Sequence, residues 1–200
     1  MYAVKYLPEQ YHLQKTLDLS NSRAAIWMNL AAIPLLFLFG WLFTRLVTFI
    51  RPYNPSGSGF LNFFSAFSVW ELGAFLLSII FMLILHELVH GLFFWLFTRA
   101  RPKFALKSGY AFAANPEWYM PSFQYVMVGL SPFVIISTVS IFLTRYVAFS
   151  WVSYLLVIAT FNAAGSLGDL IVVGWVIFQP KTILVKDEGD FFSIYGPVVE

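Results

Sequence analysis

The chain has 200 residues, of which 60% are hydrophobic, 20% aromatic and only 11% charged. This composition excludes the surface of a soluble protein and is typical of a polytopic membrane protein. The formal net charge of +2 is too small for a nucleic-acid-binding face, and the absence of cysteine excludes disulfides and thiolate metal sites. We therefore expect the partner of this surface to be the lipid bilayer and not nucleic acid.

Four apolar runs are long enough to cross a bilayer, which takes about 20 residues of helix. They cover residues 24–44, 72–98, 123–144 and 147–178. The first run is longer than the apolar core of a cleavable signal peptide, so we expect it to be a retained span. The sequence predicts an all-α polytopic membrane protein with about four transmembrane helices, in one integral membrane domain over residues 1–200.

The positive charges are divided unequally between the two sides of this four-span arrangement. Most of them lie in the N-terminal segment 1–23, in the connection between the second and third spans, and in the tail 179–200. Because cytoplasmic loops of membrane proteins carry an excess of Lys and Arg, this bias predicts that both termini are cytoplasmic. We expect the charged tail to be a solvated segment.

Two connections have recognisable patterns. Segment 51–59 is rich in turn residues, and the aromatic stretch 60–70 after it is predicted to lie along the outer membrane interface. In segment 103–113, apolar residues alternate on both sides of a Lys-Ser-Gly turn. That pattern fits a short β-hairpin, and it fits equally well an interfacial loop with aromatic anchors.

The second span contains the sequence His86-Glu87-Leu88-Val89-His90. Residues four apart share one face of a helix, so both imidazoles can bind one zinc ion. Glu87 is placed to take a proton from the attacking water of a hydrolytic reaction. The alternative is a polar cluster that bonds neighbouring helices or lines a proton path. The complete HExxH pattern favours metal-dependent hydrolysis, because imidazoles and carboxylates in a membrane are costly unless they are paired or coordinated.

A hydrolytic zinc site commonly has three protein ligands, and Asp169 is the strongest candidate for the third. His12 precedes the first span, and Glu71 stands about 22 Å of helix away from His86. His90 and Asp169 each lie about 14 Å from the cytoplasmic ends of their spans, so they can meet at one depth. The sequence therefore predicts a site in which zinc is bound by His86, His90 and Asp169.

Further polar residues accompany Asp169 in the fourth span. Asn162, Ser166 and Asp169 are spaced at i, i+4 and i+7, which predicts that they share one helical face. On that face Asn162 can donate a hydrogen bond to a developing oxyanion, and Ser166 can orient a ligand. The alternative is that these residues, with Gly165 and Gly168, serve only close helix packing.

An HExxH motif in one span, followed two spans later by an Asp near a Gly-rich, Asn-containing stretch, resembles the site-2-protease-like intramembrane zinc metalloproteases. Within that group the chain is most similar, over about residues 72–178, to the short bacterial zincin peptidases. The resemblance implies a bacterial cytoplasmic membrane location, and a strand after the HExxH helix, like segment 103–113, that holds substrate. It implies these roles for the polar residues: zinc ligands for His86, His90 and Asp169, general base for Glu87, and assistance to catalysis for Asn162.

Together these features predict a membrane-embedded zinc metalloprotease whose partner is a membrane protein or peptide substrate. It would hydrolyse peptide bonds in or next to membrane-spanning segments. One alternative is a non-proteolytic protein that binds membrane helices on a degenerate metalloprotease fold. Another is a small ion or proton transporter, which needs a polar path to both membrane surfaces, whereas the outer half of the second span offers only Ser78.

Overall fold

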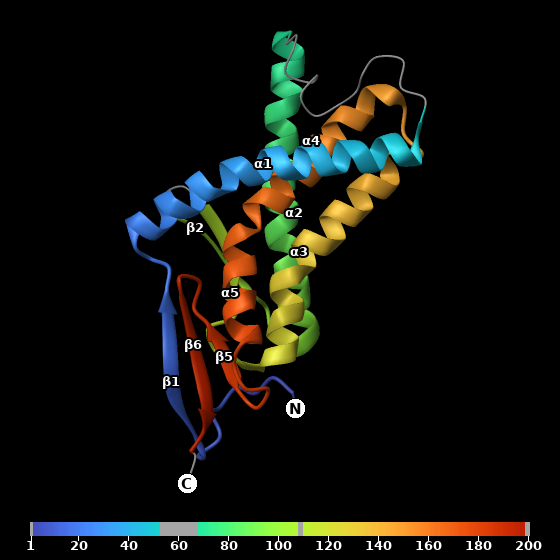
Figure 1. Ribbon diagram of the computed structural model, residues 1–200. Coiled ribbons are helices and arrows are strands. Elements are labelled where there is room, and N and C mark those ends of the chain that lie inside the picture. The colour runs from blue at the N-terminus through green and yellow to red at the C-terminus, as the bar shows by residue number, and fades with distance from the viewer. Residues whose placement is uncertain (1, 53–67, 108–109, 199–200) are drawn as a thin grey trace. The chain divides into compact units, whose positions relative to one another are not determined.

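The computed structural model describes residues 2–52, 68–107 and 110–198 (Figure 1). The described chain forms two compact units. One unit combines Met1–Met28, Glu87–Ser131 and Gly168–Glu200, and the other combines Asn29–His86 and Pro132–Leu167. Of the stretch predicted to lie along the outer interface, residues 60–67 fall outside the described residues.

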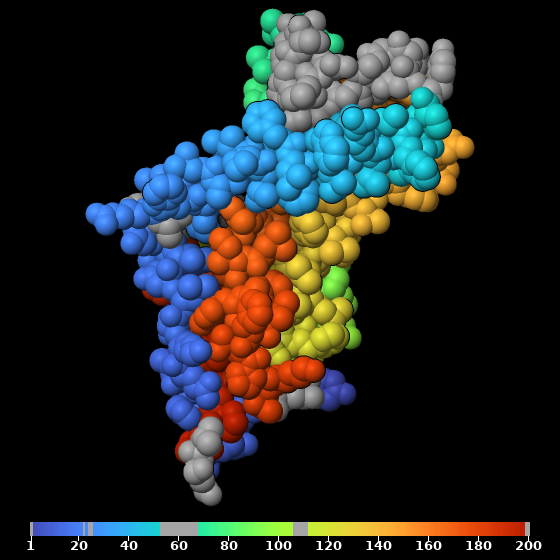
Figure 2. All heavy atoms as spheres, viewed as in Figure 1, coloured from blue at the N-terminus to red at the C-terminus, as the bar shows by residue number. Residues whose placement is uncertain are grey.

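Three helices are long and apolar enough to cross a membrane: α1 (Ser22–Ile50), α2 (Val69–Thr98) and α3 (Ser122–Leu143). Large apolar side chains are exposed along them, such as Trp27 and Trp41 of α1, which are 70% and 59% exposed. Helix α1 is the blue-to-cyan band in Figure 2. Such helices are suited to a lipid surrounding, so the chain is a membrane protein, as its composition predicts.

The fourth predicted span is broken into α4 (Phe149–Gly165) and α5 (Leu167–Ile177), which meet at a bend of 45°. The described residues therefore contain three candidate spans, or four if the bent pair crosses as one. At the break, the Ser166 backbone N–H and hydroxyl both donate to the carbonyl oxygen of Asn162, at 2.9 and 2.8 Å. The first is the last i→i−4 bond of α4, and the second is a hydroxyl bond to the same carbonyl, of the kind that often bends helices.

The bend corrects one prediction about this span. Asn162 lies on α4 and Asp169 on α5, so these two residues and Ser166 do not form one continuous helical face. Gly165 and Gly168 flank Ser166, and glycine is a weak helix former, which favours an interruption at this point. The Ser166 hydroxyl, which the sequence suggests as a group that orients a ligand, donates its hydrogen bond to the backbone carbonyl of Asn162. 

A four-stranded antiparallel sheet makes the all-α prediction imprecise. Its strands, in the order β1-β6-β5-β4, all belong to the first unit. They are β1 (Tyr11–Asp18), β6 (Phe191–Pro197), β5 (Leu184–Asp187) and β4 (Tyr119–Pro121). The tail, which we expected to be a solvated segment, instead supplies β5 and β6, and β6 pairs with β1 from the N-terminal segment (Figure 1).

The core of the first unit joins this sheet to parts of three helices. Its buried side chains come from α2, α3, α5 and the strands, among them Phe94, Val128, Val176, Val185 and Ile194. Burial of these apolar groups holds the three helices and the sheet together. The helix segments that carry His90 and Asp169 are therefore part of one packed core.

The hairpin interpretation of segment 103–113 is confirmed. Strand β2 (Lys103–Lys107) pairs antiparallel with β3 (Tyr110–Ala114) in a separate two-stranded sheet. The hairpin packs against α2 beside Gly91, where a Cβ atom would lie 2.5 Å from the ring of Phe104. The absence of a side chain at Gly91 leaves room for the tip of the Phe104 ring against α2.

The second unit has its own apolar core, formed by α1, α3 and α4. Phe43, Ile141 and Leu156 are buried there. Arg51 closes one end of this core, because its guanidinium donates to the carbonyl oxygens of Thr144 and Val147 at 3.0 and 2.7 Å. Those bonds satisfy backbone groups after α3 has ended.

Candidate metal centre

Helix α2 carries both histidines of the HExxH motif. The helix runs without interruption from Val69 to Thr98, so His86 and His90 stand one turn apart on the same face. No proline lies inside it, and its long apolar sequence supports continuous helical hydrogen bonding in a membrane. The four-residue spacing of the motif therefore places the two imidazoles next to each other on one face of the helix.

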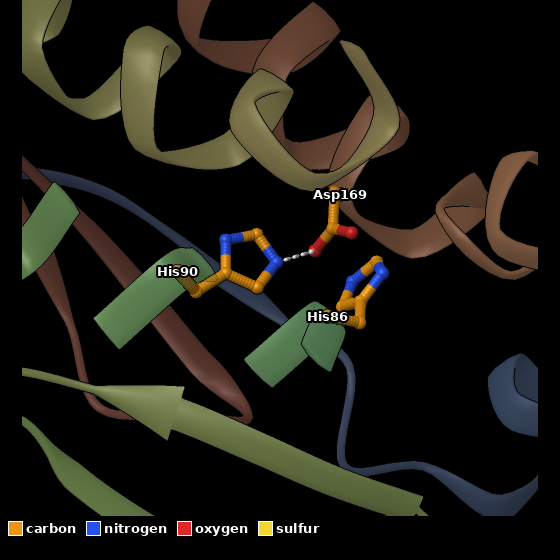
Figure 3. A group of neighbouring side chains, drawn as sticks. All are labelled: His86, His90 and Asp169. Atoms are coloured by element: carbon orange, nitrogen blue, oxygen red, sulfur yellow. Dashed lines mark ion pairs between the residues drawn. The ribbon is translucent and has the colours of Figure 1, made fainter. Parts of the chain in front are cut away.

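The imidazole of His90 is held from both sides by groups of the first unit. Nδ1 lies 3.0 Å from the carbonyl oxygen of Val128 on α3, and His90 is only 6% exposed. Since a carbonyl oxygen can only accept, Nδ1 is the protonated donor of this pair. Nε2 lies on the opposite side of the ring, 3.4 Å from Oδ1 of Asp169 on α5 (Figure 3).

The imidazole of His86 is oriented by Asn162 of α4. Asn162 Nδ2 donates to the carbonyl oxygen of Pro132 at 3.0 Å and to Ser137 Oγ at 3.2 Å. Its Oδ1 is therefore the atom that faces His86 Nδ1, at 3.0 Å. Because Oδ1 accepts, His86 also carries its proton on Nδ1, and Nε2 is the nitrogen with a lone pair for a metal.

The candidate ligand atoms of His86, His90 and Asp169 all lie within 4.8 Å of one another. In Figure 3 the two imidazoles rise from neighbouring turns of α2, and the Asp169 carboxylate points toward His90. Two histidine nitrogens and one carboxylate oxygen form a donor set that zinc accepts in hydrolytic sites. The Nδ1 hydrogen bonds also fit, because metal-binding histidines commonly donate their other N–H to a protein oxygen. The residues present therefore fit zinc.

Glu87 follows His86 on α2 and is partly buried, with Oε2 shielded from solvent. A carboxylate in such surroundings is a suitable proton acceptor when a water lies beside it. His12, by contrast, is exposed in β1, in agreement with its exclusion from the ligand set. Among the described residues, the three ligands named above are the one group with the geometry of a metal site.

Sequence reasoning missed two groups that surround the ligands. A backbone carbonyl such as that of Val128 cannot be recognised from the residue type. Pro132, four positions later, is nevertheless a usable signal, because proline leaves the carbonyl at i−4 without its helical donor. Ser137 was a serine of an apolar helix that nothing in the local pattern distinguished. Both are buried, at 2% and 7% exposure.

A buried carboxylate stands at the end of β5. Asp187 Oδ2 accepts a hydrogen bond of 3.0 Å from the Tyr125 hydroxyl, and Oδ1 accepts one of 2.8 Å from the Gly189 N–H. Burial raises the pKa of the Asp187 carboxyl to about 7, although both hydrogen bonds favour the charged form. Asp187 belongs to the tail that the sequence predicts to be a solvated segment, and the structure buries this acid in the first unit.

Comparison with known proteins bears on the chemistry of this candidate site. Residues 79–184 match the model of the DUF3267 family, which is described as "Putative zincin peptidase". No curated protein and no solved structure matches the chain. The matched region covers just over half of the chain and contains all three candidate ligands, Glu87 and Asn162. The family points to a metallopeptidase with zinc as its metal. The chain belongs to the DUF3267 family.

Proposed function

We propose that this protein is an integral-membrane zinc metalloprotease that hydrolyses peptide bonds in or next to membrane-spanning segments of other proteins. The observation that carries the proposal is the set of ligand atoms of His86, His90 and Asp169 within 4.8 Å of one another. Glu87 stands directly beside this set on the same helix. The candidate ligands and the candidate base lie together on apolar helices, and ionisable groups in such helices are costly and commonly functional.

A zinc ion bound by His86, His90 and Asp169 would polarise the scissile carbonyl and lower the pKa of the attacking water. The Glu87 carboxylate takes a proton from that water and then donates it to the leaving amine. Val128 and Asn162 hold the two imidazoles in the Nδ1–H form, with Nε2 toward the reacting groups. Asn162 thus acts as a positioning residue, because both N–H groups of its amide already donate to Pro132 and Ser137.

Strand β2 is our candidate for the substrate-binding edge. A scissile segment must be extended for attack, and in a membrane its unwound backbone needs hydrogen-bonding partners. Among the described residues β2 pairs on one side with β3, so its other side is available for an added strand. The contact between Gly91 and Phe104 holds β2 against α2 immediately after His90.

We place the protein in a bacterial cytoplasmic membrane with both termini in the cytoplasm. One sheet contains β1 from the N-terminal segment, β4 from the connection after α2, and β5 and β6 from the tail. Segments that share a sheet must lie on one side of the bilayer. These are the segments that carry most of the Lys and Arg residues, which supports the cytoplasmic side.

The test compares the wild type with Glu87→Gln in detergent micelles. Zinc is quantified by mass spectrometry, and cleavage is screened against labelled fragments of membrane proteins, with and without a zinc chelator. We expect zinc-dependent cleavage in the wild type, and in Glu87→Gln a loss of about 10²–10⁴-fold in rate with unchanged zinc content.

The matched control is Glu71→Gln, which neutralises the other carboxylate of α2 at its exposed start. Glutamine can still accept the hydrogen bonds that Ser68 gives to Glu71, so the helix start is preserved. Full cleavage by Glu87→Gln would remove Glu87 as the base. Zinc-loaded wild-type protein that binds the fragments without cleaving them would instead favour a non-proteolytic helix-binding protein.

A further inference from the structure

Pro132 interrupts the hydrogen-bond ladder of α3 next to the candidate metal centre. In an unbroken helix, the N–H of residue 132 would donate to the carbonyl oxygen of residue 128. Proline has no N–H, so the Val128 carbonyl loses this partner. A buried carbonyl without a donor is unfavourable in an apolar surrounding, and therefore another donor must take this place.

Two side chains supply the missing donors. The Ser131 hydroxyl donates to the Val128 carbonyl oxygen at 2.7 Å, and His90 Nδ1 approaches the same oxygen at 3.0 Å. Val128, Ser131 and His90 are 2%, 4% and 6% exposed, so water does not compete for this carbonyl. A carbonyl oxygen has two lone pairs, and these two donors occupy both.

The same stretch of α3 brings the Asp169 helix close. A Cβ atom on Gly129 would lie 2.4 Å from Val173 Cγ2 and 4.0 Å from the Asp169 carbonyl oxygen. The glycine therefore allows α5 to approach α3 at the level of Asp169. One short segment, 128–132, thus supplies both the acceptor for His90 and the space for the helix that carries Asp169.

We propose that Pro132 is a positioning residue for the metal ligand His90, acting through the Val128 carbonyl. This assignment rests on the proposed zinc site. Proline keeps the carbonyl open for the imidazole N–H, which fixes His90 with Nδ1 protonated and Nε2 turned toward Asp169 and the metal. An ordinary residue at position 132 would return a backbone N–H that competes with His90 for the same oxygen.

The test is Pro132→Ala, measured in the whole chain in detergent micelles. The variant keeps the carbonyl of residue 132, so the Asn162 amide retains that acceptor. We expect zinc affinity, measured by competition with a chromophoric chelator, to fall by about 10–100-fold. This is the range typical of losing a group that hydrogen-bonds to a metal ligand. In metal-free protein labelled with ¹⁵N-histidine, we expect the His90 Nδ1–H signal to shift or to exchange faster with water.

Two controls separate positioning from a general effect on the helices. Pro34→Ala makes the same change inside α1, and Ser131→Ala removes the other donor to Val128 while Pro132 remains. Pro34→Ala should keep the wild-type zinc affinity and His90 signal, whereas Ser131→Ala leaves His90 as the remaining side-chain donor to Val128 and should not loosen its Nδ1–H bond. The His90 resonance is assigned with His12→Asn and His86→Asn, because the chain has three histidines.

An unchanged His90 Nδ1–H signal in Pro132→Ala overturns the proposal, and so does an equal loss of zinc affinity in Pro34→Ala. If the wild type binds no zinc, the proposed function fails. The NMR comparison of metal-free proteins still decides whether Pro132 controls the His90 hydrogen bond.

Discussion

His86 Nδ1 and Asn162 Oδ1 lie 3.0 Å apart, although 76 positions separate the two residues in the chain. Asn162 is fully buried, and its Nδ2 is engaged by Pro132 and Ser137. The amide therefore cannot rotate without losing hydrogen bonds in an apolar surrounding. This makes Asn162 a fixed acceptor for one of the two candidate zinc-binding imidazoles.

Asn162→Ala should weaken zinc binding by about 10–100-fold, because His86 loses the acceptor that fixes its Nδ1–H form. Chelator competition in detergent measures the affinity. Ser137→Ala is the matched control, since it removes one partner of Asn162 and leaves the bonds to Pro132 and His86 in place. An equal loss in both variants would argue that packing, and not the His86 hydrogen bond, is responsible.

Asp169→Asn tests the carboxylate as the third ligand. The amide has the same shape but no charge, and it is a poorer zinc ligand than a carboxylate. We expect zinc affinity to fall by more than the roughly 10–100-fold that is typical when a residue hydrogen-bonded to a metal ligand is removed. Glu87→Gln is the comparison, because it neutralises a carboxylate next to the site without removing a ligand. Zinc content equal to that of the wild type would eliminate Asp169 from the ligand set.

Gly91→Ala tests the contact that holds β2 against α2. The new methyl group would lie 2.5 Å from Cζ of Phe104, so the ring must move away from α2. Overpacking of this kind costs about 1–3 kcal/mol, which should lower the melting temperature and reduce cleavage while zinc content is kept. If β2 binds substrate, the reduction should appear mainly in KM.

Gly73→Ala provides a control on the same helix, because no atom lies within 4 Å of the added methyl group. Alanine is the better helix former, so this variant should be more stable by about 0.5–1 kcal/mol. The double variant Gly91→Ala with Phe104→Leu relieves the crowding and should recover stability. Wild-type KM in Gly91→Ala would count against β2 as the substrate edge.

The sequence was sufficient for the features that depend on local pattern. The apolar runs predicted α1, α2 and α3, and the HExxH spacing placed His86 and His90 on one helical face. Counting helix rise from the charged ends predicted that His90 and Asp169 meet, and their side chains lie 3.4 Å apart. Alternation around a turn was enough to recognise a possible β2–β3 hairpin.

Features that depend on distant partners could not be predicted in this way. Strands β1 and β6 pair Tyr11 with Pro197, a match that no local periodicity encodes. The charges of Lys186 and Glu188 suggested a solvated tail, yet these residues pair with each other at the surface while their apolar neighbours enter the core. Proximity of Asn162 to His86 likewise depends on the packing of α4, which the sequence alone did not specify.

Asp187→Asn should change how stability depends on pH. An unfolded Asp loses its proton near pH 4, whereas burial raises the pKa of Asp187 in the folded protein to about 7. Between these values unfolding releases a proton. The stabilising contribution of the protonated group is therefore complete below about pH 4 and is lost as the pH rises toward about 7.

Asparagine does not titrate, and its side chain can keep both partners by accepting from Gly189 and donating to the Tyr125 oxygen. The melting temperature of Asp187→Asn relative to the wild type should therefore rise between about pH 5 and pH 7 and then level off. Thermal unfolding across this range, at constant zinc content, measures the difference. Glu188→Gln removes a neighbouring, more exposed carboxylate and should follow the wild-type pH profile. Parallel profiles for Asp187→Asn and the wild type would show that Asp187 is already ionised throughout this range in the folded protein.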